Sequence, residues 1–273
     1  MNTEQELDAL VAAVLASAKY RHVSPVFARA VGARELAIRP NLKAAIKATK
    51  NALHQAGGAF QDAPIDYARA LIRLQEAWNG DQTGVPFRDA CRAALAAHTS
   101  TRERLPILDE FYTTIFTALP APPLRVLDIA CGLNPLARPW MPLPPSTEYV
   151  ACDIYADQMG FLNDFMALCG YSGRAEVRDV IGSPPDEPAD LALILKTLPC
   201  LEAMDKSAPT RLLDAVRAPW LLVSFPAQTL GGRRKGMTAH YESRFRALLD
   251  ERGWPARIFE FKTELAFLVQ KPQ

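Results

Sequence analysis

The chain has 273 residues, 49% of them hydrophobic, and its 31 Lys and Arg residues nearly balance its 30 Asp and Glu residues. This size suits a full α/β domain with a smaller one beside it. Five cysteines without a Cys-x-x-Cys pair indicate reduced core thiols and no metal site. The acidic start and the absence of a long apolar run predict no signal peptide, no membrane span and a cytoplasmic location.

The first hundred residues have the pattern of successive helices. Capping signals at Thr3-x-x-Glu6, Ser24-Pro25 and Pro40 predict the starts of three helices. The first is expected to run through Ser17, and the third to end at Gly57-Gly58. Three more helices are expected at residues 64–78, 86–97 and about 100–119, the last entered through Ser100-x-x-Glu103 and interrupted by Pro106. We predict an all-helical N-terminal domain over residues 1–105.

This helical part is strongly basic. Residues 19–50 contain eight Lys or Arg residues and one acid, Glu35, whereas residues 148–214 contain twelve acids and five bases. In the third helix Lys43, Lys47, Lys50 and His54 recur at steps of four, three and four, which places them in one stripe. A solvated helix face would look similar, but the surrounding arginines favour contacts to RNA phosphates. The predicted RNA-binding residues here are Lys19, Arg21, Arg39, Lys43, Lys47 and Lys50.

The segment 125–136 predicts a buried strand that passes through an acid into a tight turn. Gly132 is its only glycine, so the turn lacks the Gly-x-Gly-x-x-Gly pattern of dinucleotide sites. The charge of Asp128 would repel a pyrophosphate and attract an ammonium or sulfonium group. The segment resembles the first motif of class I S-adenosylmethionine methyltransferases, whose cofactor carries both of these cations and no phosphate.

Six more strands are expected, at residues 148–154, 175–180, 190–196, 220–226, 256–260 and 264–269. The second and third strands lead to Asp153 and Asp179, placed to accept hydrogen bonds from a ribose and from an adenine amino group. The fourth strand is apolar almost throughout, as a central parallel strand requires. We predict an α/β fold for residues 106–273, with a Rossmann-like, mostly parallel seven-stranded sheet and an antiparallel finish.

A second basic element follows the fifth strand. In Leu230–Met237, glycines flank three adjacent cations, Arg233, Arg234 and Lys235. An ordinary surface loop would also be polar, but the glycines and the position at the expected cofactor edge favour a loop that clasps the substrate.

Several motifs together give a specific resemblance. They are His98-x-Ser100-Thr101-x-Glu103-Arg104, Leu127–Leu136, Asp190–Lys196, Val223–Pro226 leading to Leu230–Met237, Lys19-Tyr20-Arg21, and His54-x-x-Gly57-Gly58-Ala59. With these motifs the chain resembles, over nearly its whole length, the aminoglycoside-resistance 16S rRNA guanine-N7 methyltransferases. It is most similar to the type carried by actinomycete producers, such as the sisomicin and gentamicin resistance methylase.

This resemblance implies transfer of a methyl group from S-adenosyl-L-methionine to N7 of guanine 1405 in the decoding site of the assembled 30S subunit. Because guanine N7 carries a lone pair and no proton, no general base and no catalytic dyad are expected. The rate enhancement is expected to come from alignment of the reacting atoms. The expected partner is 16S rRNA in the 30S subunit, with neither DNA nor a membrane, and the chain is expected to be a monomer.

The resemblance also implies site residues. For the cofactor these are Phe60, His98, Thr99, Ser100, Arg104 as partner of the carboxylate, Asp128, Ala130, Gly132, Asp153, Ile154, Asp179, Val180 and Leu195. Lys196, Arg233, Arg234, Lys235 and Met237 are expected to engage the target nucleotide, which must leave its stack.

The sequence leaves alternative functions open. A methyltransferase acting on another rRNA position or on a small metabolite would share the C-terminal fold, and an RNA-binding protein with a vestigial fold would lack cofactor binding. The Asn/Asp-Pro-Pro-aromatic motif of exocyclic-amine methylases is absent. Pro199-Cys200 matches the nucleophile pair of cytosine-C5 methylases, but the acid that those enzymes place nearby is missing.

Overall fold

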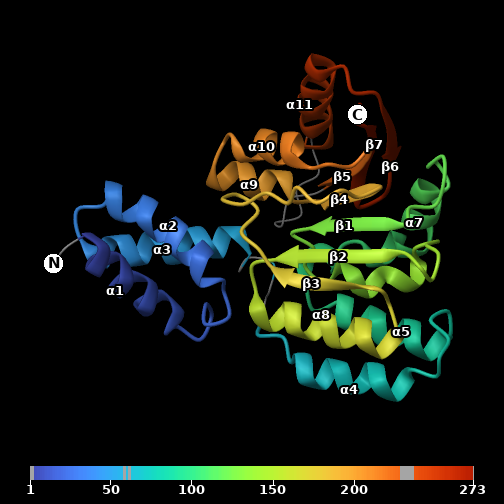
Figure 1. The fold of residues 1–273 in the computed structure, drawn as a ribbon, viewed down its shortest axis with the longest axis horizontal. Helices are drawn as coiled ribbons and strands as arrows, with labels where there is room; N and C mark the ends of the chain where they lie inside the picture. The colour runs from blue at the N-terminus through green and yellow to red at the C-terminus, as the bar shows by residue number, and fades with distance from the viewer. Residues whose placement is uncertain (1–2, 58–59, 61–62, 228–236, 273) are drawn as a thin grey trace.

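The computed structural model describes residues 3–57, 60, 63–227 and 237–272, with the backbone alone for residues 237–239. A twisted sheet lies between two layers of helices, and a lobe made of the first three helices projects from one side (Figure 1). The strands of the sheet are β1 (Arg125–Ile129), β2 (Glu148–Asp153), β3 (Gly173–Val177), β4 (Leu191–Leu195), β5 (Trp220–Pro226), β6 (Ala256–Glu260) and β7 (Glu264–Gln270).

The strand order is β3-β2-β1-β4-β5-β7-β6. Strands β1 to β5 are parallel to one another, and β7 is antiparallel to both β5 and β6. The predicted seven-stranded sheet with an antiparallel finish is confirmed. The order reverses between β1 and β4, and ligands of open α/β sheets bind at such a switch point, beyond the carboxyl ends of the strands.

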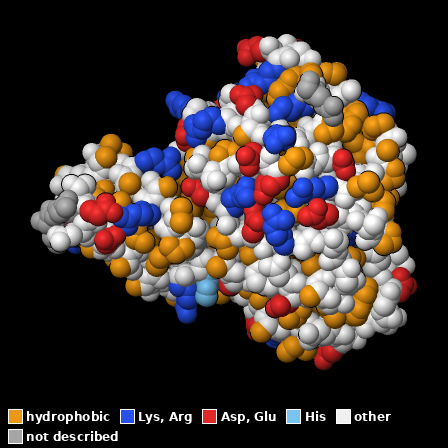
Figure 2. Space-filling view, viewed as in Figure 1, with side chains coloured by type: hydrophobic (Ala, Val, Ile, Leu, Met, Phe, Trp, Pro, Cys, Tyr) orange, Lys and Arg blue, Asp and Glu red, His pale blue; other side chains and the backbone are white. Residues whose placement is uncertain are grey.

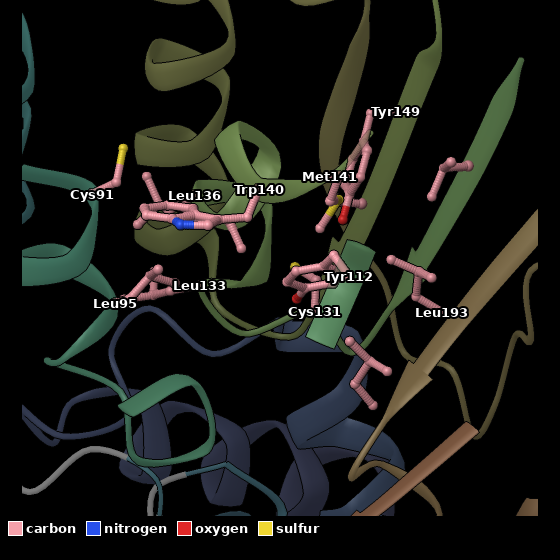
Figure 3. Packing of buried hydrophobic residues seen from close by; sticks show 14 of the residues in the cluster. Cys91, Leu95, Tyr112, Cys131, Leu133, Leu136, Trp140, Met141, Tyr149 and Leu193 are labelled. Carbon is pink, nitrogen blue, oxygen red and sulfur yellow. The ribbon is translucent and has the colours of Figure 1, made fainter. Parts of the chain in front are cut away.

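Side chains that alternate along the strands form a separate core on each face of the sheet. On one face, Val126 and Leu193 pack with α4 (Tyr67–Ala77), α5 (Val85–Leu95), α7 (Leu108–Phe116) and α8 (Ala156–Cys169). Figure 3 shows Leu136 and Trp140 of the 3-10 helix η3 (Asn134–Trp140) in this core with Tyr149 and Leu193. On the other face, Leu127 and Ile194 pack with α9 (Leu198–Met204), α10 (Ala208–Ala215) and α11 (Met237–Arg252).

The projecting lobe consists of α1 (Thr3–Leu15), α2 (Pro25–Ile38) and α3 (Leu42–Ala56). Ser24 and Asn41 cap α2 and α3 by accepting backbone N–H groups through their side chains. The lobe has its own core, with Leu10, Val31 and Leu53 fully or almost fully buried. Backbone hydrogen bonds from Ser24 to Ile154 and from Ala156 to His22 join this lobe to the end of β2.

The packing divides the chain earlier than the predicted boundary at residue 105. Leu74 of α4 and Phe87 of α5 are fully buried in the core of the sheet domain, so only α1 to α3 form a separate body. The expected helix at 100–119 is divided by Pro106 into α6 (Thr99–Arg102), a 3-10 turn and α7; α6 begins before Ser100, with His98 as its N-cap. Within the described residues, no helix is long and apolar enough to cross a membrane.

Candidate functional site

A cleft opens at the switch point of the sheet, between its carboxyl edge and the α1–α3 lobe. Of the residues predicted to hold a cofactor, ten line this cleft: Phe60, His98, Ser100, Ala130, Gly132, Asp153, Ile154, Asp179, Val180 and Leu195. The structure therefore brings together residues that are up to 135 positions apart in the sequence. Thr99, Arg104 and Asp128 are buried and do not line it.

Asp153 lies at the end of β2, where its carboxylate holds the turn that follows β1. Its Oδ2 accepts the Gly132 N–H at 2.8 Å and its Oδ1 accepts the Ile154 N–H at 2.6 Å. Burial raises the pKa of Asp153, and these two backbone donors oppose the rise. The carboxylate is thus fixed in orientation at the wall of the cleft, as a receptor for paired hydroxyl groups must be.

Asp179 and Val180 form the far wall of the cleft, two residues beyond the end of β3. The strand ends at Val177 rather than at residue 180, and Asp179 Oδ1 instead accepts the N–H groups of Ile181 and Gly182 at 2.9 and 3.1 Å. This turn places the apolar side chains of Val180 and Ile181 along the cleft, where a flat aromatic ring would pack.

The turn after β1 has an unusual backbone. Ala130 and Gly132 have positive φ angles of 52° and 53°, and Lys196, at the end of the neighbouring strand β4, has 59°. Left-handed alanine and lysine each cost roughly 1 kcal/mol or more. A Cβ atom on Gly132 would lie 2.9 Å from the His98 ring, so glycine is required there by both conformation and space.

His98 covers this turn from α6. Its ring is 8% exposed and stacks on Phe60 with 5.7 Å between ring centroids. Burial, reinforced by the charges of Lys196 and Arg102, lowers the pKa of His98 to about 4. The ring is therefore neutral at physiological pH, and its buried Nδ1 has no hydrogen-bond partner among the described residues.

We expect His98 to make the folded state sensitive to acid. The folded pKa lies below the usual 6.5, so the unfolded chain binds the proton and stability falls as the pH drops from about 6.5 toward 4. The loss should reach about 2 kcal/mol between pH 7 and pH 5. Urea unfolding at both pH values should show a smaller loss for His98→Gln, which does not titrate. Equal losses in both proteins would contradict this expectation.

Arg104 is paired with a carboxylate of the protein itself. Its Nε and Nη2 donate to the two carboxylate oxygens of Glu264 at 3.0 and 2.7 Å, and its Nη1 donates to Asn134 Oδ1 at 2.8 Å. The guanidinium is 2% exposed, and a charge that is so buried needs a compensating carboxylate. The structure supplies this carboxylate from β7. A contact between Arg104 and the cofactor's carboxylate stays a prediction.

Asp128 lies beneath the turn rather than in the wall of the cleft. Its Oδ2 accepts hydrogen bonds from Tyr149 and Asn134, whereas its Oδ1 is buried without a partner among the described residues. Burial raises the pKa of Asp128 to about 7, against the lowering effect of these donors and of Arg104. An unpartnered buried carboxylate oxygen suits a cationic ligand group.

Lys196 lines the cleft, but its ammonium group is held by the protein. Nζ donates to Ser100 O at 3.0 Å and to Glu103 Oε2 at 2.9 Å, and lies 3.4 Å from Glu264 Oε2. The side chain is 4% exposed, so it ties α6 to the edge of the sheet. Its engagement of a target nucleotide stays a prediction.

Comparison with known proteins identifies the family. The model of the ribosomal RNA methyltransferase family FmrO matches residues 16–268. The chain belongs to this family of rRNA methyltransferases. A protein of Micromonospora echinospora is 40% identical over 98% of both chains, and one of Serratia marcescens is 36% identical over 97% of this chain and 98% of its own. Both relatives are named 16S rRNA (guanine(1405)-N(7))-methyltransferase.

Solved structures agree with this family. The 16S rRNA methyltransferase RmtF, in complex with S-adenosyl-L-homocysteine, is 36% identical with a TM-score of 0.82 over 100% of this chain and 99% of its own. The 16S rRNA methylase RmtB is 30% identical with a TM-score of 0.80, over 97% and 98% of the two chains. This methyltransferase is S-adenosylmethionine dependent, and the unpartnered Asp128 Oδ1 and the aligned Asp153 fit that cofactor.

The basic stripe of the methyltransferase lies on α3, whose carboxyl end meets the cleft at Ala56 and Gly57. Lys43 and Lys47 are exposed and form no ion pair with any residue that the structure describes, whereas Leu53 on the opposite side is buried. Figure 2 shows Lys and Arg side chains on this lobe, with acidic side chains beside them near its tip. The stripe therefore leads along the helix from the tip of the lobe toward the cleft (Figure 1).

Other predicted RNA contacts already have partners within the protein. Lys50 Nζ donates to Ser17 Oγ, Lys19 Nζ is 2.9 Å from His54 Nδ1, and Arg39 pairs with Glu35. Arg21 is exposed, with its Nε donating to Ala18 O. The predicted substrate loop lies outside the described residues; this concerns Arg233, Arg234 and Lys235 and the side chain of Met237.

Two groups of candidate residues were missed by the sequence analysis. Arg69 and Arg73 are exposed on α4 and line a groove with Pro64 and Ile65. Their spacing of four on one helix was a readable signal. Asn134 and Glu264 are buried partners of Arg104, and no local pattern marks them because their contacts span 30 and 160 positions.

Proposed function

We propose that this chain methylates N7 of guanine 1405 in 16S rRNA, within the assembled 30S subunit, and thereby confers resistance to aminoglycosides. One observation supports this most directly: a cofactor cleft with Asp153 and Asp179 lies at the end of a helix whose exposed face carries Lys43 and Lys47. The names of the full-length relatives supply the target atom. Because the substrate is ribosomal, we also place the protein in the cytoplasm. We propose further that it acts as a monomer.

The residues of the cleft would hold the cofactor in a fixed pose. Asp153 accepts the ribose hydroxyls, Asp179 and the Val180 backbone bind the adenine edge, and Leu195 with Ile154 contacts its apolar surface. Asp128 receives the ammonium group. The bound cofactor supplies an electrophilic methyl group on a sulfonium.

The described residues match a reaction without proton transfer. Guanine N7 attacks with a lone pair, so the protein has only to align the two atoms in line and exclude water. His98, the histidine of the cleft, is neutral and hydrogen bonds to no carboxylate among the described residues, so it has no partner to orient it as a base. The Cys200 thiol has a pKa raised to about 11 by burial, which disfavours the nucleophile of a cytosine-C5 methylase.

Methyl transfer from tritiated S-adenosylmethionine tests the proposal. We expect label in purified 30S subunits and much less in free 16S rRNA or in small metabolites, because the basic lobe needs a folded RNA surface to dock on. Strand scission at N7-methylguanine should map the label to position 1405. Label at another nucleotide, or no label in intact subunits, would contradict the proposal.

A further inference from the structure

A row of buried polar side chains runs from the last strand of the sheet to Asp128, beneath the turn that lines the cofactor cleft. We call it the Asp128 relay; its members are Glu264, Arg104, Asn134 and Asp128, each at most 2% exposed. They come from β7, the segment before α7, η3 and β1, which are distant in sequence. Buried polar groups carry a high cost unless they are paired, so a connected row fixes the orientation of every member.

Glu264 anchors the relay. Its oxygens accept two N–H groups of Arg104, and Oε1 also accepts the Ser224 hydroxyl at 2.6 Å. Burial raises the pKa of Glu264, but the charges of Arg104 and Lys196 outweigh it and lower the pKa overall. Arg104 is thus held by an ionised carboxylate, with its Nη1 directed at Asn134.

Asn134 has one possible amide orientation. The donor Nη1 of Arg104 lies 2.8 Å from its Oδ1, and the Tyr112 hydroxyl donates to the same oxygen. Because a guanidinium can only donate, the amide oxygen must face Arg104, and the amide nitrogen must face the other way. That nitrogen donates to Asp128 Oδ2 at 2.9 Å.

The two oxygens of Asp128 are therefore unequal. Oδ2 accepts from Asn134 and from the Tyr149 hydroxyl at 2.6 Å, whereas Oδ1 has no partner among the described residues although it is buried. Two donors on one oxygen prevent rotation of the carboxylate. They also favour its charged form, against the desolvation that raises its pKa.

We propose that Asn134, oriented by the Glu264–Arg104 pair, is a positioning residue. It keeps the Asp128 carboxylate ionised and in one orientation, so that Oδ1 can accept a hydrogen bond from the ammonium group of the cofactor. Tyr149 has the same role from the other side. The inference rests on the proposed function only through its cofactor.

Two ligands separate this role from general damage to the cleft. S-adenosylhomocysteine carries the ammonium group, whereas 5′-methylthioadenosine shares its adenosine and sulfur but has no amino-acid end. We expect Asn134→Leu and Tyr149→Phe each to lower the affinity for S-adenosylhomocysteine about 10-fold in calorimetry at pH 7. The affinity for 5′-methylthioadenosine should fall less than about 2-fold. Asn163→Leu is the matched control, because its amide bonds to the backbone of Ala175 in β3, two strands away from β1.

A second readout is the pH dependence of binding. Without one donor the pKa of Asp128 rises further, so S-adenosylhomocysteine should regain affinity for both variants as the pH increases from 7 to 8.5. The charged or titratable groups that face Asp128 are Arg104, Tyr112, Tyr149, Cys131, Cys152 and Asp153. Asp153 is proposed to bind the ribose of both ligands. The affinity for 5′-methylthioadenosine would therefore also change with pH if Asp153 titrated.

An equal loss of affinity for both ligands would show a merely structural role and overturn the proposal. Unchanged affinity for S-adenosylhomocysteine would also overturn it. If Asn134→Leu does not fold, Tyr149→Phe decides, because it removes one hydroxyl group. Subunit methylation does not enter this assay, so an enzyme inactive on 30S subunits would overturn the proposed function and leave the ligand comparison valid.

Discussion

Replacing Asp153 with alanine should abolish cofactor binding, with a fall in S-adenosylhomocysteine affinity of about 100-fold or more. Two effects combine in this variant. The receptor for the ribose hydroxyls is lost, and the N–H groups of Gly132 and Ile154 lose the acceptor that holds the turn after β1. Calorimetry with S-adenosylhomocysteine measures the effect.

The matched control is Asp164→Ala, which removes an exposed carboxylate from α8. It should bind the cofactor as the unmodified protein does. Asp153→Ala should also keep its affinity for 30S subunits, since the basic face of α3 is untouched. A variant that binds S-adenosylhomocysteine within about 3-fold of the parent would refute the ribose role of Asp153.

Replacing Lys43 and Lys47 with glutamate should weaken binding to the 30S subunit and spare cofactor binding, the reverse of Asp153→Ala. We expect the affinity for 30S subunits to fall by about 100-fold, because two phosphate contacts become repulsions, while S-adenosylhomocysteine affinity stays unchanged. The salt dependence of binding should also become shallower, by roughly 0.7 to 0.9 in the logarithmic slope for each contact that is lost. Filter binding across a salt series measures both quantities.

Arg217→Glu with Arg257→Glu is the matched control, because it changes the net charge equally at the amino edge of the sheet, away from the cleft. Equal losses in both double variants would mean that net charge governs docking. In that case the basic stripe of α3 would have no specific role.

The fold was predictable where the chemistry is local. Each of the seven strands was found within a few residues. Apolar runs mark the buried strands β4 and β5, and terminal acids mark the ends of β2 and β3. Asp153 and Asp179 line the cleft as expected, since the carboxyl ends of neighbouring parallel strands lie at one edge. Pro106 divided the predicted helix for an equally local reason.

What escaped prediction depends on distant contacts. The partner of Arg104 within the protein, Glu264, lies 160 positions later and was not anticipated. The basic count of residues 19–50 overstated the free charge, because Arg29 pairs with Glu4 and Asp8 of α1, outside that window. The membership of α4 and α5 in the sheet domain likewise depends on packing against α8, which local periodicity does not reveal.

The attachment of the lobe has a thermodynamic consequence. Ile154 and Tyr155 line the cofactor cleft and also pack in the core of the α1–α3 lobe. A ligand that orders these two residues would therefore lower the conformational freedom of the lobe on which we propose that RNA docks. Linkage is reciprocal, so any gain in RNA affinity on cofactor binding equals the gain in cofactor affinity on RNA binding. If the lobe and the cleft couple through Ile154 and Tyr155, each ligand reduces the ordering cost of the other.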